Sequence, residues 1–237
     1  MSDAPRSSLP VLGVLLAVGL TASGWLVGSA IRHFKDAERY VSVKGLAERE
    51  VAANLAIWPV VFSVSGNDLS DLQTRLEQDA AKIEAFLRGR GFGEAEFSLS
   101  APRVTDNAPS GSWEGRMPTE RYQVETTVTL RTIRVDEARA AMEASGELVR
   151  AGVRLLRSWE YNTQYFFTDL ESVKPEMIAA ATRDARRAAE KFAQDSGAGI
   201  GGIRRATQGY FSIEDRDPFS PEWKKIRVVT SIDYFVE

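Results

Sequence analysis

The chain has 237 residues, of which 43% are hydrophobic and 27% are charged, a composition that is ordinary for a globular protein. Its formal net charge is −3 and its pI is about 5.5. A generic nucleic-acid binder carries a basic excess, so no nucleic-acid partner is expected. The sequence contains no cysteine, which excludes disulfides, thiolate metal sites and thiol nucleophiles.

An uncharged apolar segment lies close to the N-terminus, from Leu9 to Ile31. As a helix it would rise about 35 Å, and the hydrocarbon core of a bilayer is about 30 Å thick. Leu20 falls near the middle of the segment, and Trp25 falls near its downstream end, where aromatic side chains gather at a membrane–water boundary. The segment predicts a transmembrane helix or signal anchor that binds the membrane.

Two alternatives concern the processing and the orientation of this segment. In a cleaved secretory signal, Leu9–Leu20 would be the apolar core and Gly28–Ala30 the cleavage site, but the segment is long for a signal core. The positive charges after the segment outnumber those before it, which by itself would place the large domain in the cytoplasm. That rule weakens for long translocated domains, so both orientations stay open on charge alone.

The segment divides the chain into four regions: a short tail (1–8), the transmembrane helix or signal anchor (9–31), a linker (32–39) and one folded domain (40–237). The last region has about 200 residues, enough to bury a sizeable core without disulfides.

The first predicted strands are Tyr40–Lys44 and Leu55–Ser65, which are rich in β-branched and aromatic residues. In the second strand the apolar positions change phase at Trp58 and Pro59. Such a slip is typical of a β-bulge, and proline cannot donate to a ladder. We therefore expect a bulge or a sheet edge there.

Helical spacing of leucine and isoleucine predicts a helix from Asp68, its N-cap, to Arg88, ended by Gly89 and Gly91. A strand at Phe97–Val104 and a loop at Asp106–Thr119, which contains Trp113, follow.

The remaining elements are predicted by the same periodicities. They are a half-buried strand from Tyr122 to Arg131, a helix at Val135–Ser145 ended by Gly146, a strand from Leu155 to about Phe167, a helix from about Val173 to Ser196 with Pro175 in its first turn, and a strand from Ile226 to Val236. The inner face of the long helix is predicted to consist of Met177, Ala181, Ala185, Ala188 and Phe192.

This order of elements predicts an α+β fold, with helices packed on one face of mainly antiparallel sheet. The two parts of the chain each look like a strand–helix–strand–strand unit, which hints at a duplication. The predicted transmembrane helix precedes this fold.

Two sequence motifs resemble the SIMPL-domain family, which consists of uncharacterised bacterial periplasmic or envelope proteins. The first is Val41–Gly45 followed by the strand that ends at Ser65–Asn67. The second is the alanine-rich helix Ala180–Ala193, which leads into Gly197 and Gly201. The resemblance spans about Tyr40 to Glu237. It implies an extracytoplasmic α+β domain that self-assembles, with stress-related roles suggested for relatives and no catalytic residues to carry over.

The sequence offers no constellation of residues that predicts catalysis, a metal site or a cofactor. The single histidine, His33, flanks the apolar segment, which excludes a Ser-His-Asp triad in the domain. Gly197, Gly199 and Gly202 formally match a dinucleotide motif, but they follow a helix and precede a strand, so a C-cap and turn are favoured.

Three further patterns have a functional and a plainer interpretation. The stripe Arg183, Arg187 and Lys191 could attract an anion, but a solvated helix face is favoured. Glu120 with Glu125 could act as acid and base, although spacing alone does not place them together. The aromatic face Trp159, Tyr161, Tyr165 and Phe167 is more typical of core packing or a protomer interface than of a ligand platform.

The sequence favours a non-enzymatic protein that is anchored in the inner (cytoplasmic) membrane by one span. Its domain is expected on the periplasmic side, and the protein is expected to form a homo-oligomer. A role in an envelope, oxidative or DNA-damage stress response is what the resemblance suggests. Its protein partner stays unknown. The alternative is an extracytoplasmic small-molecule-binding domain or a carboxylate-dependent hydrolase, either of which needs a deep pocket.

Overall fold

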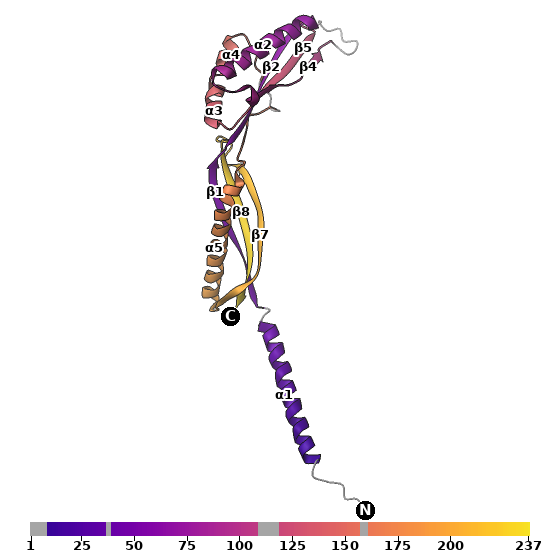
Figure 1. Ribbon diagram of the computed structural model, residues 1–237, viewed down its shortest axis with the longest axis vertical. Helices are drawn as coiled ribbons and strands as arrows, with labels where there is room; N and C mark the ends of the chain where they lie inside the picture. The colour runs from indigo at the N-terminus through magenta and orange to yellow at the C-terminus, as the bar shows by residue number, and fades with distance from the viewer. Residues whose placement is uncertain (1–8, 37–38, 109–118, 157–160) are drawn as a thin grey trace, which may run out of the picture. The chain divides into compact units, whose positions relative to one another are not determined.

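The computed structural model describes residues 9–36, 39–108, 119–156 and 161–237, and the side chains at 9–12 and 30–36 lie outside this description (Figure 1). The chain forms two compact units. Unit 1 comprises Met1–Glu48, Lys174–Ser212 and Arg227–Glu237, and unit 2 comprises Arg49–Val173 and Ile213–Ile226. Most of unit 2 is therefore inserted into the sequence of unit 1, so the units are not the two successive halves that the sequence suggested.

Helix α1 spans Leu9–Asp36. It confirms the predicted helix over 9–31 and continues into the predicted linker, which is helical as far as Asp36. The remaining positions of that linker before Arg39 lie outside the described residues, as does the tail 1–8.

Unit 1 is built on long strands covered by one long helix. Strands β1 (Tyr40–Ala52), β8 (Trp223–Val236) and β7 (Ile200–Asp215) form a sheet in the order β1-β8-β7. Helix α5 (Leu170–Ser196) runs along this sheet (Figure 1). Alternate residues of β8 from Lys224 to Tyr234 are buried, as expected for a strand with one covered face.

Helix α5 packs on the sheet through a face of alanines. The buried positions recur every fourth residue from Met177, at Ala181, Ala185, Ala189 and Ala193. These small side chains allow a close approach: a β-carbon added at Gly45 of β1 would lie 1.9 Å from the carbonyl oxygen of Ala181. One residue on, the backbone N–H of Leu46 donates to Oδ2 of Asp184 at 3.0 Å, and this bond lowers the pKa of Asp184.

The structure corrects two positions on the predicted inner face of this helix. Ala188 is exposed, and the ring of Phe192 is 54% exposed. The prediction changed phase after Ala185, whereas the buried stripe keeps its four-residue spacing and places Ala189 and Ala193 inward. Pro175 also lies further inside the helix than expected, because α5 begins at Leu170 rather than at about Val173.

Unit 2 contains a second antiparallel sheet. Its central strands are β2 (Leu55–Gly66) and β5 (Tyr122–Thr132), with β3 (Phe97–Leu99) and β4 (Arg103–Asp106) beside β5 and β6 (Gln164–Phe166) beside β2. Helices α2 (Leu69–Gly89), α3 (Val135–Glu143) and α4 (Gly146–Arg150) and the 3-10 turn η1 (Glu94–Glu96) complete the unit.

Helix α2 confirms its prediction closely. Asp68 caps the N-terminus by accepting hydrogen bonds from the backbone N–H groups of Ser70 and Asp71 at 2.8 and 3.0 Å. The predicted apolar positions are all buried in the core against β2 and β5: Leu72, Leu76, Ile83 and Leu87.

The bulge expected at Trp58 and Pro59 is absent from the ladder between β2 and β5, whose register is unbroken from Ala56 to Gly66. The apolar phase changes because both faces of β2 are largely buried, so each face supplies its own apolar series. The alternative prediction, a sheet edge at Trp58 and Pro59, agrees better with the structure. Pairing with β6 covers only Leu55–Ile57, and Pro59 lies just beyond it.

Other predicted elements are divided in the structure. The strand predicted at Phe97–Val104 becomes β3 and β4, both paired with β5. The helix predicted at Val135–Ser145 ends at Glu143, and Gly146 opens α4 instead of ending the helical region. Of the strand predicted at Leu155–Phe167, the structure has β6 and a single bridge from Leu155 to Phe62. Residues 157–160, with Trp159, and 109–118, with Trp113, lie outside the described residues.

The two units share one strand order. In unit 1 the chain runs β1, α5, β7, β8 and the sheet order is first, last, middle. In unit 2 the chain runs β2, α2, β3, β5 and the sheet order is again first, last, middle. Each unit therefore has a strand–helix–strand–strand pattern, and the fold is α+β with antiparallel sheets. In unit 1, however, the pattern uses β1 in place of the strand predicted at Leu155–Phe167 and includes β7, which was not predicted.

An ion-paired carboxylate fixes η1 against the end of β5. Glu96 accepts hydrogen bonds from the hydroxyl of Thr132, from the backbone N–H of Gly93 at 2.8 Å and from the guanidinium of Arg134 at 2.7 Å. These bonds, that from Thr132 above all, lower the pKa of Glu96, although partial burial opposes the shift.

A lowered pKa in the folded state gives stability that is present above the unfolded pKa and is lost as the pH falls through the folded pKa. The unfolded pKa of glutamate is about 4.3. We therefore expect Glu96→Gln to destabilise the protein at pH 7, and the difference from the wild type to shrink below about pH 4. Urea unfolding across this pH range measures the difference.

Glu94→Gln is the matched control. The side chain of Glu94 is 80% exposed, and its ion pair with Arg88, at 3.4 Å, lies in solvent. It should change the free energy of unfolding little at any pH. A gap between wild type and Glu96→Gln that is the same at pH 7 and at pH 3 would contradict this role for Glu96.

Candidate functional site

One cavity in the described part of unit 2 has a volume of about 660 Å3, within the range of small-molecule sites. It lies beside the stretch of β2 between two pairings. The pairing with β6 ends at Ile57, and the bridge to Leu155 begins at Phe62. These two pairings are out of register with one another, so they do not belong to one continuous ladder. The described lining residues are Trp58, Pro59, Val60, Val61, Met142, Ser145, Leu155, Leu156, Tyr161, Asn162 and Thr163.

The described lining of this cavity is aromatic and aliphatic, with a few uncharged polar groups. Trp58 is almost fully buried, whereas Tyr161 is partly exposed. The Sδ atom of Met142 is 3.6 Å from the hydroxyl of Tyr165 and 3.8 Å from Oγ1 of Thr163. Burial raises the pKa of Tyr165, so its hydroxyl keeps its proton and donates to the sulfur.

A smaller cavity of about 140 Å3 adjoins the first and shares Val61 and Tyr161 with it. Its described lining also includes Glu125 of β5 and Arg103 of β4, which stand opposite each other in the ladder. Their side chains are 3.8 Å apart, which is an ion pair but not a hydrogen bond. Threonines of β5, among them Thr126 and Thr127, also line the smaller cavity.

The structure does not place the two acids suggested by the sequence in one site. Glu120 accepts a hydrogen bond from the hydroxyl of Ser65, while Glu125 pairs with Arg103. No carboxylate is among the described residues that line the larger cavity.

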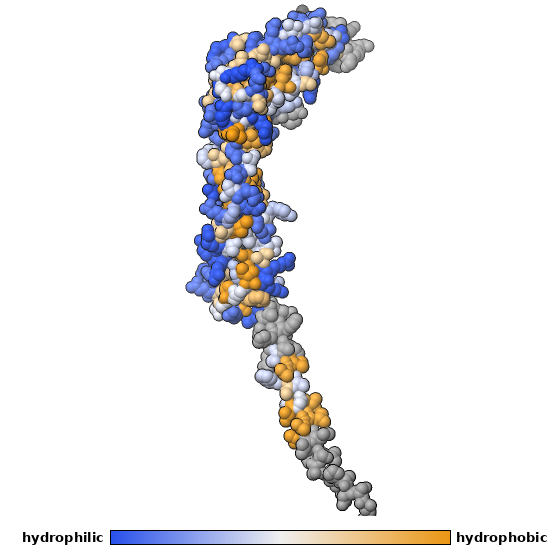
Figure 2. Space-filling model, viewed as in Figure 1, coloured by the Kyte–Doolittle hydropathy of each residue, from blue (hydrophilic) through white to orange (hydrophobic). Residues whose placement is uncertain are grey.

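The residues predicted to span the membrane lie on α1. Leu20 and Trp25 are each 68% exposed, and apolar residues form much of the surface of this helix (Figure 2). Leu9 and Ile31 are helical, but their side chains lie outside the described residues. Within the described residues, no helix meets the length and apolarity needed to cross a bilayer. The membrane span stays a prediction.

A family model matches residues 41–229, which is most of the chain. Its description is SIMPL, a protein of unknown function (DUF541). The chain belongs to the SIMPL family. No curated protein matches it. The resemblance of Val41–Gly45 and of the alanine-rich helix to this family is thereby confirmed, and the two motifs meet in the structure where β1 packs on α5.

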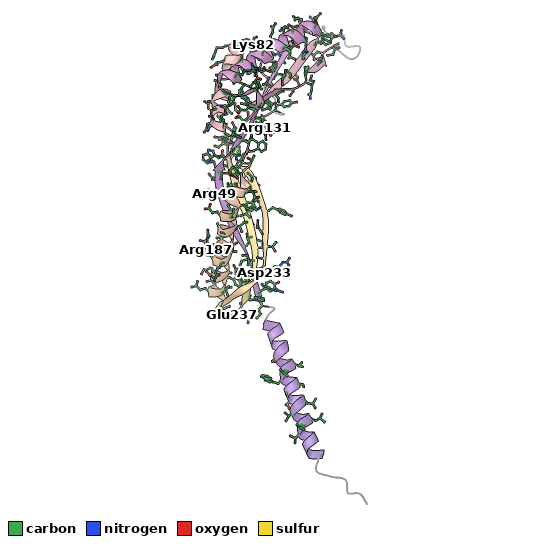
Figure 3. All side chains as sticks on the ribbon, viewed as in Figure 1. Arg49, Lys82, Arg131, Arg187, Asp233 and Glu237 are labelled. Atoms are coloured by element: carbon green, nitrogen blue, oxygen red, sulfur yellow. The ribbon has the colours of Figure 1, made fainter. Side chains whose placement is uncertain are left out.

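In this SIMPL protein the basic stripe on α5 is largely neutralised. Arg187 pairs with Asp184 at 2.8 Å, and Lys191 pairs with Asp195 at 2.6 Å; Arg187 is marked on the helix in Figure 3. The neighbouring Arg186 pairs with Glu190 at 2.8 Å, which leaves Arg183 as the member of the stripe with the freest charge. The pairing supports the interpretation as a solvated helix face.

The glycine motif of this SIMPL chain ends a helix. Gly197 follows α5 with φ of +70°, and the N–H of Ala198 donates to the carbonyl of Ala193 at 2.9 Å. This is a helix C-cap, and the chain then enters β7, as the sequence order predicted. Among the described residues no group of three or more histidine, cysteine or acidic side chains could hold a metal ion; His33 lies outside the described side chains.

The aromatic face predicted on one strand is divided between two environments. Tyr165 belongs to the buried core, whereas Tyr161 lines both cavities. No sequence pattern indicated that Met142, Ser145 and Asn162 would meet. They come from separate segments and line the same cavity in the structure.

Proposed function

We propose that this SIMPL protein is non-enzymatic, is anchored by α1 in the inner (cytoplasmic) membrane as a single-pass protein, and self-assembles through its folded body on the periplasmic side. A role in an envelope, oxidative or DNA-damage stress response, suggested for relatives, belongs to the same proposal. The observation that carries it is the exposed apolar surface of α1.

The apolar side chains of α1 are exposed over most of the helix circumference. At 100° per residue the large described ones span about 240° of it, and the remaining sector carries small residues such as Gly13, Ala17 and Gly24. Each of the large ones is between 58% and 68% exposed: Val14, Leu15, Leu16, Val18, Leu20, Trp25, Leu26 and Val27. A helix that packs on a protein surface is apolar along one stripe only, whereas acyl chains surround a helix completely. Side chains project from more than one side of α1 in Figure 3.

The periplasmic orientation is supported by membership of the SIMPL family, through the envelope location that the resemblance implies. The non-enzymatic clause is supported by the chemistry of the larger cavity, whose described lining contains hydroxyl and amide groups but no ionisable acid or base apart from the tyrosine. Acid–base catalysis needs a group that titrates near the working pH.

Self-assembly is supported by the outer edge of β7. Among the strands that the structure describes, β7 pairs only with β8, and its residues from Gly202 to Gln208 are exposed on both faces. Tyr210 is 99% exposed and Ile203 is 54% exposed. A long edge with free backbone groups and exposed apolar side chains is a template for pairing with another chain. A second copy is the occupant that we propose.

The anchor is tested by carbonate extraction of membranes that contain the full-length protein. We expect the wild type to stay with the membrane pellet, with its N-terminus intact by sequencing. Leu16→Arg combined with Leu20→Arg should move the protein into the extract, because each arginine costs about 3 kcal/mol at the centre of a span.

Leu99→Arg is the control, since Leu99 is a similarly exposed leucine in β3 and its replacement should leave the protein in the pellet. Alkaline phosphatase fused after Glu237 should be active if the body is periplasmic. An intact wild-type chain that carbonate releases would contradict the anchor, and an inactive fusion would contradict the orientation.

The assembly is tested by sedimentation of the full-length protein in detergent. We expect an oligomer for the wild type and a monomer for the double variant Ile203→Lys with Tyr210→Lys, because lysines on an edge oppose strand pairing. Phe219→Lys, at a residue 94% exposed between β7 and β8, should leave the oligomer intact. A wild-type protein that sediments as a monomer would contradict self-assembly.

A further inference from the structure

The end of unit 1 that leads to α1 brings four chain segments together. The N–H of Val236 donates to the carbonyl of Arg39 at 3.0 Å, so β8 ends where β1 begins. Gly199, just before β7, exchanges two backbone hydrogen bonds with Glu237, at 2.9 and 3.0 Å. Helix α5 ends at Ser196, shortly before these bonds, so its last turn lies there as well. We call this the anchor end of unit 1.

The covalent chain keeps the anchor end close to the proposed membrane span. Helix α1 continues to Asp36, past the apolar segment that ends at Ile31, and so rises about 8 Å further. The headgroup layer of a bilayer is about 5–8 Å thick. From Asp36 to Tyr40, the first residue of β1, the backbone reaches at most about 14 Å. A surface tethered so closely has an effective concentration on the order of millimolar, so a weak attraction to the headgroups is enough to hold it there.

The anchor end exposes two aromatic rings. Tyr40 is 48% exposed, and Phe192 is 54% exposed near the end of α5. On α5, which is described throughout, Phe192 is the one large hydrophobic side chain that is exposed. The guanidinium of Arg204 of β7 stacks on the ring of Tyr40, 4.1 Å from its centroid. Aromatic rings are enriched at the membrane–water boundary, and the edge of a stacked guanidinium can still donate to phosphate oxygens.

The charges at the anchor end have both signs. Arg204 and Arg205 of β7 are offset by Asp233 of β8 and by Glu237, which Figure 3 marks at this end of the sheet. Residues 32–38 contain two basic and two acidic side chains besides His33. Attraction to an anionic lipid therefore adds little here. The exposed rings supply the attraction, and a phospholipid of zero net charge is sufficient, because it carries the phosphate and the interface that they need.

We propose that the anchor end of unit 1 lies on the headgroup layer of the membrane that holds α1. The rings of Tyr40 and Phe192 enter the membrane–water interface, and the guanidinium of Arg204 donates to a lipid phosphate. This contact rests on the proposed function, because it needs α1 in the membrane. It adds a second membrane contact beside the span, made by the folded body itself.

Nitroxide spin labels test the contact, since the chain has no cysteine and one introduced cysteine takes one label. The full-length protein is placed in phosphatidylcholine nanodiscs and labelled at Gln194→Cys or, as the reference, at Ala179→Cys. Both residues are exposed on α5 and lie about 22 Å apart along the helix. Power saturation with lipid-soluble oxygen and with a water-soluble nickel chelate measures the depth of each label. We expect the label at 194 within about 5–10 Å of the lipid phosphates, and the label at 179 in water.

Removal of the rings should release the anchor end from the membrane surface. Tyr40→Ser combined with Phe192→Ser should move the label at 194 into water, because the remaining side chains no longer gain from the interface. Both rings are substantially exposed, so the fold should tolerate their loss. Phe219→Ser is the matched control. It removes a ring that is 94% exposed between β7 and β8, and it should leave the depth at 194 unchanged.

A label at 194 that meets the nickel chelate as freely as the label at 179 overturns the proposal. So does a label at 194 that collides less with both oxygen and the chelate, which would indicate cover by protein rather than by lipid. A depth that persists without the two rings overturns it as well. Carbonate extraction separates this outcome from the proposed function: release of the wild type ends the anchor, whereas a retained chain with the label at 194 in water ends this contact alone.

Discussion

The distance between α5 and β1 is the constraint on which unit 1 depends. At Gly45 the helix backbone occupies the space that any β-carbon would need, with the carbonyl oxygen of Ala181 1.9 Å from that position. Alanines on the helix and glycine on the strand together permit this approach. The hydrogen bond from Leu46 to Asp184 fixes the register of α5 on β1, and it joins residues that are 138 positions apart in the sequence. The contact closes a loop that contains nearly all of unit 2, so it carries a large loop-closure entropy and forms between distant parts of the sequence.

The same close packing explains why α5 does not cover the β7 edge of the sheet. The core under α5 consists of Ala185 and Ala189 with Ile232 and Tyr234 of β8, and Val41 and Val43 of β1 border it. A face of alanines is narrow, so it covers β1 and β8 but leaves Ile203 and Tyr210 of β7 in solvent. The edge that we propose for self-assembly is thus a consequence of the helix that closes the unit. Strand β1 follows α1 in the sequence, so the proposed anchor leads directly into the strand that this contact fixes.

The sequence predicted the elements whose residues alternate between two different environments. Helix α2 and strands β5 and β8 each have one buried face and one that is exposed or half-buried, and their periodicity located them well. Strand β7 was missed because both of its faces are exposed, so it has no alternation. In β2 both faces are largely buried, and this was mistaken for a bulge.

The cavity could not be predicted, because Met142, Ser145 and Tyr161 meet only through tertiary structure. The family, by contrast, was recognisable, since its motifs encode the contact between β1 and α5.

The most direct test of the close contact is the free energy of unfolding of Gly45→Ala, measured by urea titration of the full-length protein in detergent and followed by circular dichroism. No rotamer can relieve a β-carbon that clashes with backbone atoms, so the helix itself must move, and we expect a destabilisation of at least about 3 kcal/mol. Gly202→Ala is the control, because a β-carbon there would meet nothing within 4 Å, and it should change stability by less than about 0.5 kcal/mol. Equal effects of the two substitutions would contradict the account.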